Sequence, residues 1–166
     1  MNAASPQRLA RLWAPWRSRF IYQRNVKGCI FCRAVRSHED RRHYVVQRSR
    51  HAFAMLNLYP YNNGHVMIAP RRHIADLRRC SDVELLDLWH LAGQMQGRLT
   101  RALKPHGMNL GVNLGRAGGA GIPGHVHVHL VPRWRGDTNF ITTVSDVKVI
   151  SESLDELYRR LTVRGS

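Results

Sequence analysis

The chain has 166 residues, 43% of them hydrophobic, so it can bury one core and is short for two domains. Its 26 Lys and Arg against 11 Asp and Glu give a formal charge of +15, which favours anionic partners without choosing among nucleotides, nucleic acid and acidic lipid. No apolar run approaches a membrane span and the first residues lack the apolar stretch of a secretory signal, so we expect a cytoplasmic protein.

Residues 1–28 are rich in arginine and carry no clear pattern of helix or strand. We expect an ordered arm with little regular structure, anchored on the body of the protein by its aromatic side chains Trp13, Trp16, Phe20 and Tyr22. No internal repeat or linker interrupts the remaining residues, 29–166, which are therefore predicted to form a single domain.

The three cysteines, Cys29, Cys32 and Cys80, are an odd number, which fits a reducing compartment better than a disulfide framework. Cys29-Ile-Phe-Cys32 has the spacing of a zinc knuckle, but a tetrahedral site needs two further ligands, which histidines would supply. The alternative is a pair of reduced cysteines packed in the core. A redox pair is less favoured because no thioredoxin-like pattern surrounds it, and Cys80 is expected only to pack.

The middle of the chain alternates strand patterns with one long helix pattern. Two strands are predicted within 43–58 with a turn near residues 48–50, and a third over 65–70 after the turn YPYNNG. Ser81 and Glu84 form a capping-box pattern that opens a helix ending at Lys104-Pro105. Strands over 108–114 and 125–132 and a short helix over about 151–161 complete an α+β domain around an antiparallel sheet of about five strands.

The strand over 125–132 carries the strongest chemical signal. Because side chains alternate along a strand, His125, His127 and His129 are predicted on one face, with apolar residues on the other. A lone histidine on a strand usually serves packing, but three aligned imidazoles indicate chemistry. The preceding loop, RAGGAGIPG, can present backbone N–H groups to an anion, although a plain turn would use glycine as well.

HVHVHLVPRW matches the His-x-His-x-His-x-x signature, with apolar residues between the histidines, and the chain therefore resembles the histidine-triad superfamily. The resemblance covers nearly the whole chain and is closest to the branch of diadenosine tetraphosphate phosphorylases and related hydrolases. It is carried further by LWAPWR at 12–17, CIFC at 29–32, LNLYPYNNGHVMIAPRRH at 56–73, NLG at 113–115 and PRWRGDTNF at 132–140.

The resemblance implies nucleotidyl transfer, in which His127 attacks the α-phosphate to give a nucleotidyl-histidine that water or phosphate resolves. A neutral imidazole is nucleophilic near neutral pH, and a covalent intermediate divides the displacement into two steps. His127 then needs an acceptor for its other ring nitrogen, for which we expect a backbone carbonyl. The resemblance places His129 against the phosphate oxygens and the leaving group, where it would stabilise developing charge.

Further site residues follow from the resemblance alone. Asn57 matches a ribose contact and Asn113 a polar position beside the phosphate, although both would also suit a turn or a sheet end. Zinc would be held as a structural ion by Cys29, Cys32, His73 and His125. Relatives often carry Gln and Ser or Thr before the triad, where this chain has Gly121-Ile122, so backbone donors such as Gly119 and Gly121 are expected to replace side chains at the phosphate.

Two classes of function remain open at this stage. The leading hypothesis is an enzyme that cleaves dinucleoside polyphosphates, with diadenosine tetraphosphate as the first substrate and the acceptor, water or phosphate, undecided. The alternative is a basic protein that binds nucleic acid while its histidines hold metal, or one that removes adenylate from DNA ends. The resemblance also implies a two-fold homodimer built through an exposed edge strand.

Overall fold

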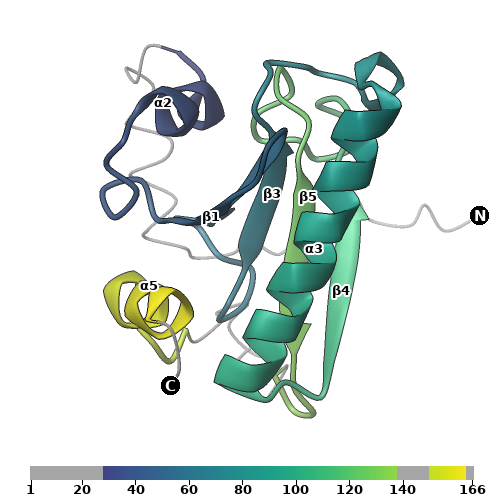
Figure 1. The fold of residues 1–166 in the computed structure, drawn as a ribbon. Helices are drawn as coiled ribbons and strands as arrows, with labels where there is room; N and C mark the ends of the chain where they lie inside the picture. Colours follow the sequence, from purple (N-terminus) through teal and green to yellow (C-terminus); the bar gives the residue numbers. More distant parts are fainter. Residues whose placement is uncertain (1–27, 138–149, 164–166) are drawn as a thin grey trace, which may run out of the picture.

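The computed structural model describes residues 28–137 and 150–163, so the predicted arm and its aromatic anchors lie outside the described residues. Five strands form one antiparallel sheet in the order β1-β2-β3-β5-β4, which confirms the predicted α+β class (Figure 1). Their bounds are β1 Val45–Arg48, β2 Ala52–Leu56, β3 Val66–Pro70, β4 Gly107–Val112 and β5 Val128–Arg133.

One face of the sheet is covered by α3 (Asp82–Leu103) and α5 (Leu154–Thr162). The helix α3 begins as predicted, because the Ser81 backbone N–H donates to the Glu84 carboxylate at 2.8 Å, and it ends where Lys104 turns to φ +47°. Its buried side chains pack on alternate residues of the strands, among them Ile68, Val128 and Leu130. This layer is the main core.

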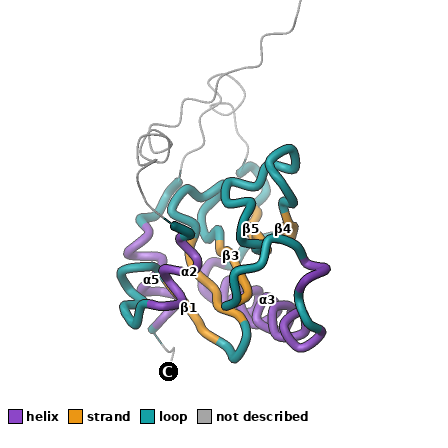
Figure 2. The backbone as a smooth tube through the Cα atoms, turned by 90° about the horizontal axis from the view of Figure 1, so that it is seen from above, coloured by secondary structure: helices purple, strands orange, loops and turns teal. Residues whose placement is uncertain are grey.

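The opposite face carries a helix that the sequence pattern did not predict. This helix, α2 (Ile30–Arg36), packs Phe31 and Ala34 against Phe53 and Met67, so the strands lie between α2 and α3 (Figure 2). Seven residues are too few to show a helical repeat in the sequence, and the Cys-x-x-Cys motif conceals the pattern further. A 3₁₀ turn, η1 (Leu77–Arg79), precedes α3.

The histidine strand starts later than predicted. β5 begins at Val128, because neither of its neighbours pairs with it before that residue: Ile68 of β3 and Val112 of β4 both lie opposite Val128. The preceding residues are held otherwise, since the Val126 N–H donates to Ile74 O at 2.6 Å. The prediction of a strand over 125–132 is therefore wrong for residues 125–127.

Among the described residues, no helix is long and apolar enough to cross a membrane.

Candidate active site and metal centre

The three histidines lie on the face of the sheet that α2 covers. His129 is paired with Met67, a residue of the α2-side core, whereas Val128 and Leu130 point into the α3-side core. The rings of His127 and His129 are 4.7 Å apart between centroids, and both side chains are buried. Phe31 of α2 contacts the rings of His125 and His127, so the three imidazoles share one face while Val128 and Leu130 pack on the other.

His127 has one ring nitrogen committed to the backbone. Its Nδ1 lies 2.8 Å from His125 O, and because a carbonyl only accepts, Nδ1 must carry the proton. The lone pair of the neutral ring is then on Nε2. A backbone carbonyl is the acceptor that we predict from the sequence for this ring.

His129 is oriented by a fourth histidine, His65. The Tyr61 backbone N–H donates to His65 Nδ1 at 3.0 Å, so the neutral ring of His65 carries its proton on Nε2. That Nε2 donates to His129 Nδ1 at 2.9 Å, which leaves the proton of His129 on its own Nε2. His129 Nε2 is buried and has no hydrogen-bond partner among the described residues. It is therefore a fixed donor that lacks an acceptor beside His127.

Burial keeps these rings neutral. It lowers the pKa of His65 to about 3 and that of His129 to about 4, and neighbouring histidines add to both shifts. Burial also lowers the pKa of His127, although the hydrogen bond to His125 O opposes the shift. Neutral rings at neutral pH are the condition under which each histidine can offer one lone pair and one N–H.

The loop before His65 is held on both sides. Asn57 Oδ1 accepts from the Tyr59 N–H at 2.9 Å, and the Asn57 amide group lies 3.2 Å from His65 Nδ1. The buried Asn62 donates to Pro132 O at 2.9 Å and to Asp137 at 2.8 Å. These contacts hold the peptide between them, whose N–H determines the tautomer of His65.

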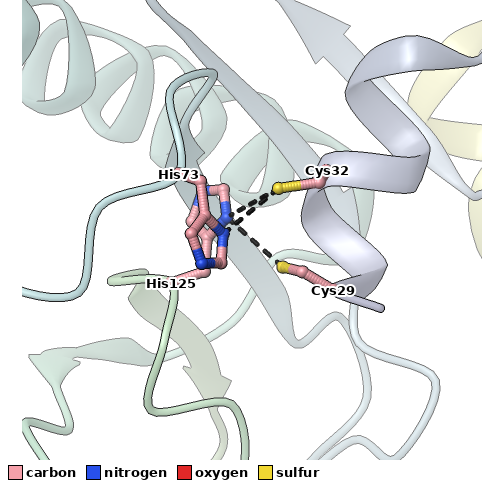
Figure 3. A group of neighbouring side chains, drawn as sticks. All are labelled: Cys29, Cys32, His73 and His125. Carbon is pink, nitrogen blue, oxygen red and sulfur yellow. Dashed lines mark hydrogen bonds between the residues drawn. The ribbon is translucent and has the colours of Figure 1, made fainter. Parts of the chain in front are cut away.

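The structure brings together all four residues expected to hold zinc. The ligand atoms of Cys29, Cys32, His73 and His125 lie within 4.8 Å of one another, so the group can hold a metal ion (Figure 3). The two cysteines come from the start of α2, His73 from the segment after β3 and His125 from the residues before β5. Burial, together with the nearby Cys29, raises the pKa of the Cys32 thiol.

The distances within this group fit a tetrahedral zinc ion. The separations from sulfur to Nδ1 are 3.2 Å for Cys32 and His73, 3.4 Å for Cys29 and His125, and 3.7 Å for Cys32 and His125. Zinc bound tetrahedrally to thiolate and imidazole places sulfur and nitrogen about 3.5 Å apart. His125 Nε2 donates to Pro70 O at 2.8 Å, so its Nδ1 carries the lone pair that a metal requires.

The residues expected at the phosphate are not gathered into one group as the four candidate metal ligands are. Asn113 Nδ2 donates to Gly119 O at 3.4 Å, so this side chain closes the glycine-rich loop. Gly119 has φ +85° and Gly121 is exposed in the same loop. Asn57, by contrast, is part of the hydrogen-bond network of His65.

His65 and Tyr61 are the site residues that sequence reasoning missed. A single histidine directly after a turn, as in Gly64-His65, carries no pattern that distinguishes a site residue from a structural one. The pairing of Met67 with His129 puts it beside the triad, and that register is a property of the folded sheet. His65 is buried directly before a strand, which is a signal of a site residue, but burial cannot be read from the sequence.

A comparison with models of known protein families shows to which family the chain belongs. The family model described as "HIT domain" matches residues 39–136, which is more than half of the chain. The chain belongs to the HIT family. The HIT match begins after Cys29 and Cys32, so half of the metal-binding group lies outside it.

Curated HIT relatives and solved structures agree with this membership. An AP-4-A phosphorylase of Mycobacterium tuberculosis is 37% identical over 161 residues, covering 92% of this chain and 83% of the relative. A bis(5'-nucleosyl)-tetraphosphatase (asymmetrical) of Schizosaccharomyces pombe is 32% identical over 93 residues, covering 56% and 50%. A histidine triad nucleotide-binding protein of Sulfolobus tokodaii has a TM-score of 0.64 at 26% identity, covering 81% of this chain and 89% of that one.

Proposed function

We propose that this HIT protein is an enzyme that cleaves dinucleoside polyphosphates by transferring a nucleotidyl group through His127. The observation that carries the proposal is the pair of fixed tautomers, with a lone pair on His127 Nε2 next to a donor on His129 Nε2. The 37% identity to an AP-4-A phosphorylase supports diadenosine tetraphosphate as the substrate.

In the first step the lone pair of His127 Nε2 attacks the α-phosphorus. A nitrogen–phosphorus bond forms, the bond to the bridging oxygen breaks, and its electron pair leaves with the remaining polyphosphate. His127 becomes positively charged in the intermediate, and the acceptor His125 O stabilises the proton that stays on Nδ1. In the second step an oxygen of water or of phosphate bonds to phosphorus, the nitrogen–phosphorus bond breaks, and its electron pair returns to His127 Nε2, which restores the neutral ring; an attacking water releases one proton to solvent.

His129 contributes a preorganised hydrogen bond to this displacement. Its Nε2–H has no acceptor among the described residues, so a phosphate or bridging oxygen would satisfy a buried donor. Charge accumulates on that oxygen as the bond breaks, so the hydrogen bond strengthens towards the transition state. In the glycine-rich loop, Gly119 and Gly121 are proposed to offer backbone donors to the phosphate, and Asn57 and Asn113 to line the site.

The direct test is incubation of the purified protein with diadenosine tetraphosphate, with and without inorganic phosphate, followed by separation of the products. AMP and ATP would show hydrolysis, and phosphate-dependent ADP and ATP would show phosphorolysis. His127→Ala should lower turnover by about 10⁴-fold or more, because the nucleophile is lost. Turnover that survives in His127→Ala would overturn the mechanism, and no turnover by the unaltered protein would overturn the substrate.

We propose that Cys29, Cys32, His73 and His125 bind zinc as a structural ion. The distances support this assignment, as does the free lone pair on His125 Nδ1. Zinc bound there would fix the ring of His125, whose own carbonyl accepts the proton of His127 Nδ1. Metal analysis of the purified protein should give one zinc per chain.

We also propose a homodimer in a reducing compartment such as the cytoplasm. The edge strand β4 exposes Leu110, and Leu114 follows it with half of its surface exposed, which supports pairing of two copies along this edge. None of the three cysteines is in a disulfide, which suits reducing conditions. Sedimentation should then give twice the chain mass of 19.1 kDa.

A further inference from the structure

The rings of His125, His127, His129 and His65 form a histidine row. One aromatic side chain lies at each end of this row, and the two differ in how much of their surface is exposed. Phe31 packs on His125 and His127, with ring centroids 4.9 and 4.8 Å away, and is completely buried. Tyr61 packs on His65 and His129, at 4.6 and 5.6 Å, yet 47% of its surface is exposed. A completely buried ring cannot contact a ligand, whereas a ring with about half of its surface exposed can.

The exposed ring of Tyr61 is held by fixed neighbours. Its own backbone N–H is bound to His65 Nδ1, and the next residue, Asn62, is buried and bonded to Pro132 O and Asp137. Its ring lies within 37° of the plane of His65 and 30° of that of His129. The ring thus continues the aromatic row outwards from His129 towards solvent, at little entropic cost for a ligand that stacks on it.

The chemistry of the proposed reaction says which part of a substrate reaches this end. His127 takes the α-phosphate, and His129 donates towards the oxygens of that phosphate and of the departing chain. Tyr61 lies against His129 and is not among the rings that contact His127. Of the groups on the α-phosphorus, the departing polyphosphate is the one whose oxygen gains charge beside the His129 donor, and we therefore place it, with whatever it carries at its far end, beside Tyr61.

We propose that Tyr61 is a specificity-determining residue that stacks on the nucleobase of the departing nucleotide. This inference rests on the proposed function and deepens it, because it selects dinucleoside polyphosphates over mononucleotides with a bare phosphate chain. A nucleobase gains stacking energy on an exposed aromatic ring, and a terminal phosphate gains none. Both nucleosides of the substrate are then recognised, one on each side of the bond that breaks.

A matched pair of substrates isolates this contact. Diadenosine tetraphosphate and adenosine 5′-tetraphosphate share the transferred nucleotide and the phosphate chain and differ at the distal nucleoside. Turnover of each is measured for the unaltered protein, for Tyr61→Leu, which keeps an apolar cover on His129, and for Tyr61→Phe, which keeps the aromatic face. The quantity compared is the ratio of the two kcat/KM values, in which any general effect on His129 cancels.

We expect Tyr61→Leu to lower this ratio about 10-fold, within the range that removal of one stacking aromatic residue produces, and Tyr61→Phe to leave it within about twofold. An unchanged ratio in Tyr61→Leu would overturn the inference and leave Tyr61 as a cover for His129. Binding of both compounds to His127→Ala, with and without Tyr61→Leu, gives the same comparison without turnover. If the unaltered protein cleaves neither compound, the proposed function fails, and the ratio of binding affinities alone decides the role of Tyr61.

Discussion

The histidines at the two ends of the histidine row are both held in a fixed orientation, but by different groups. At one end His125 is oriented by Pro70 O and by a group of thiol and imidazole ligands suited to a metal. At the other end His129 is oriented by His65, which takes its own orientation from the backbone N–H of Tyr61. The first end, called the metal end below, carries ligands suited to an ion, whereas the other end relies on the chain alone.

The difference teaches how the tautomer of a buried histidine can be fixed by uncharged groups. In His125 and His127 one ring nitrogen is hydrogen-bonded to a backbone carbonyl, which can only accept. In His129 the link runs through His65 to a backbone N–H, which can only donate. The proton position on His127 and His129 then follows from the fold of the main chain. Removal of either support should affect stability and catalysis in different proportions, which makes the comparison testable.

The largest expected effect is at the metal end. Removal of zinc with a strong chelator should lower the free energy of unfolding by about 4 kcal/mol if the free metal was about 1,000 times its dissociation constant. The reason is that the proposed zinc would bind only the folded protein, which assembles Cys29, Cys32, His73 and His125 from three separate segments. Denaturant unfolding with and without chelator measures the change, and restored zinc should reverse it.

The matched control for the metal end is the remaining cysteine. Cys29→Ser should abolish the response to chelator, whereas Cys80→Ser should retain it, because Cys80 does not belong to the metal-binding group. A chelator response that persists in Cys29→Ser would show that the metal is held elsewhere.

A smaller effect is expected at the other end of the histidine row, and it concerns the rate of catalysis more than stability. His65→Leu removes the donor to His129 Nδ1, so His129 no longer keeps its proton on Nε2, and kcat should fall about 10- to 100-fold. His65→Gln can still donate to His129 and should recover most of this loss. Steady-state kinetics with diadenosine tetraphosphate separates kcat from KM, and nitrogen chemical shifts of His129 report its tautomer.

Equal losses in His65→Leu and His65→Gln would contradict this role, because they would show that size at position 65 matters more than the donated proton. A loss confined to KM would also contradict it, since a tautomer that acts in the transition state should affect kcat.

The contrast between the two ends also explains what the sequence could predict. Cys29-x-x-Cys32 and the alternating histidines are local patterns, so the grouping of the four candidate metal ligands and the shared face of the histidines could be predicted from spacing and resemblance. The role of His65 depends on the antiparallel register that sets Met67 opposite His129, a contact between residues 62 positions apart, which no local pattern encodes. The orientation of Tyr61 depends on the same register.

The fold followed the same rule. The helix α3 was predicted with its capping box because 22 residues show a clear helical repeat, whereas the seven residues of α2 show none. The late start of β5 was missed because it depends on where its neighbours β3 and β4 cease to pair with it. Strand ends are set by partners, and partners are distant in sequence.

The smallest expected effect is a dependence of stability on pH that belongs to the end without metal. The pKa of His65 is about 3 in the folded protein and about 6.5 in an unfolded chain, so the unfolded state binds more protons between these values. Stability is therefore complete above about pH 6.5 and declines as the pH falls towards 3. Between pH 7 and 5.5 this single group should cost about 1 kcal/mol. His65→Gln does not titrate and keeps a donor to His129, so the loss between the two pH values should be smaller in this variant by that amount. Urea unfolding of both proteins at the two pH values measures the difference, in which the protonation of the metal ligands cancels because both proteins retain them. Identical losses would mean that His65 is charged, or free to become charged, in the folded protein, and the chain of tautomers from Tyr61 to His129 would then have no fixed direction.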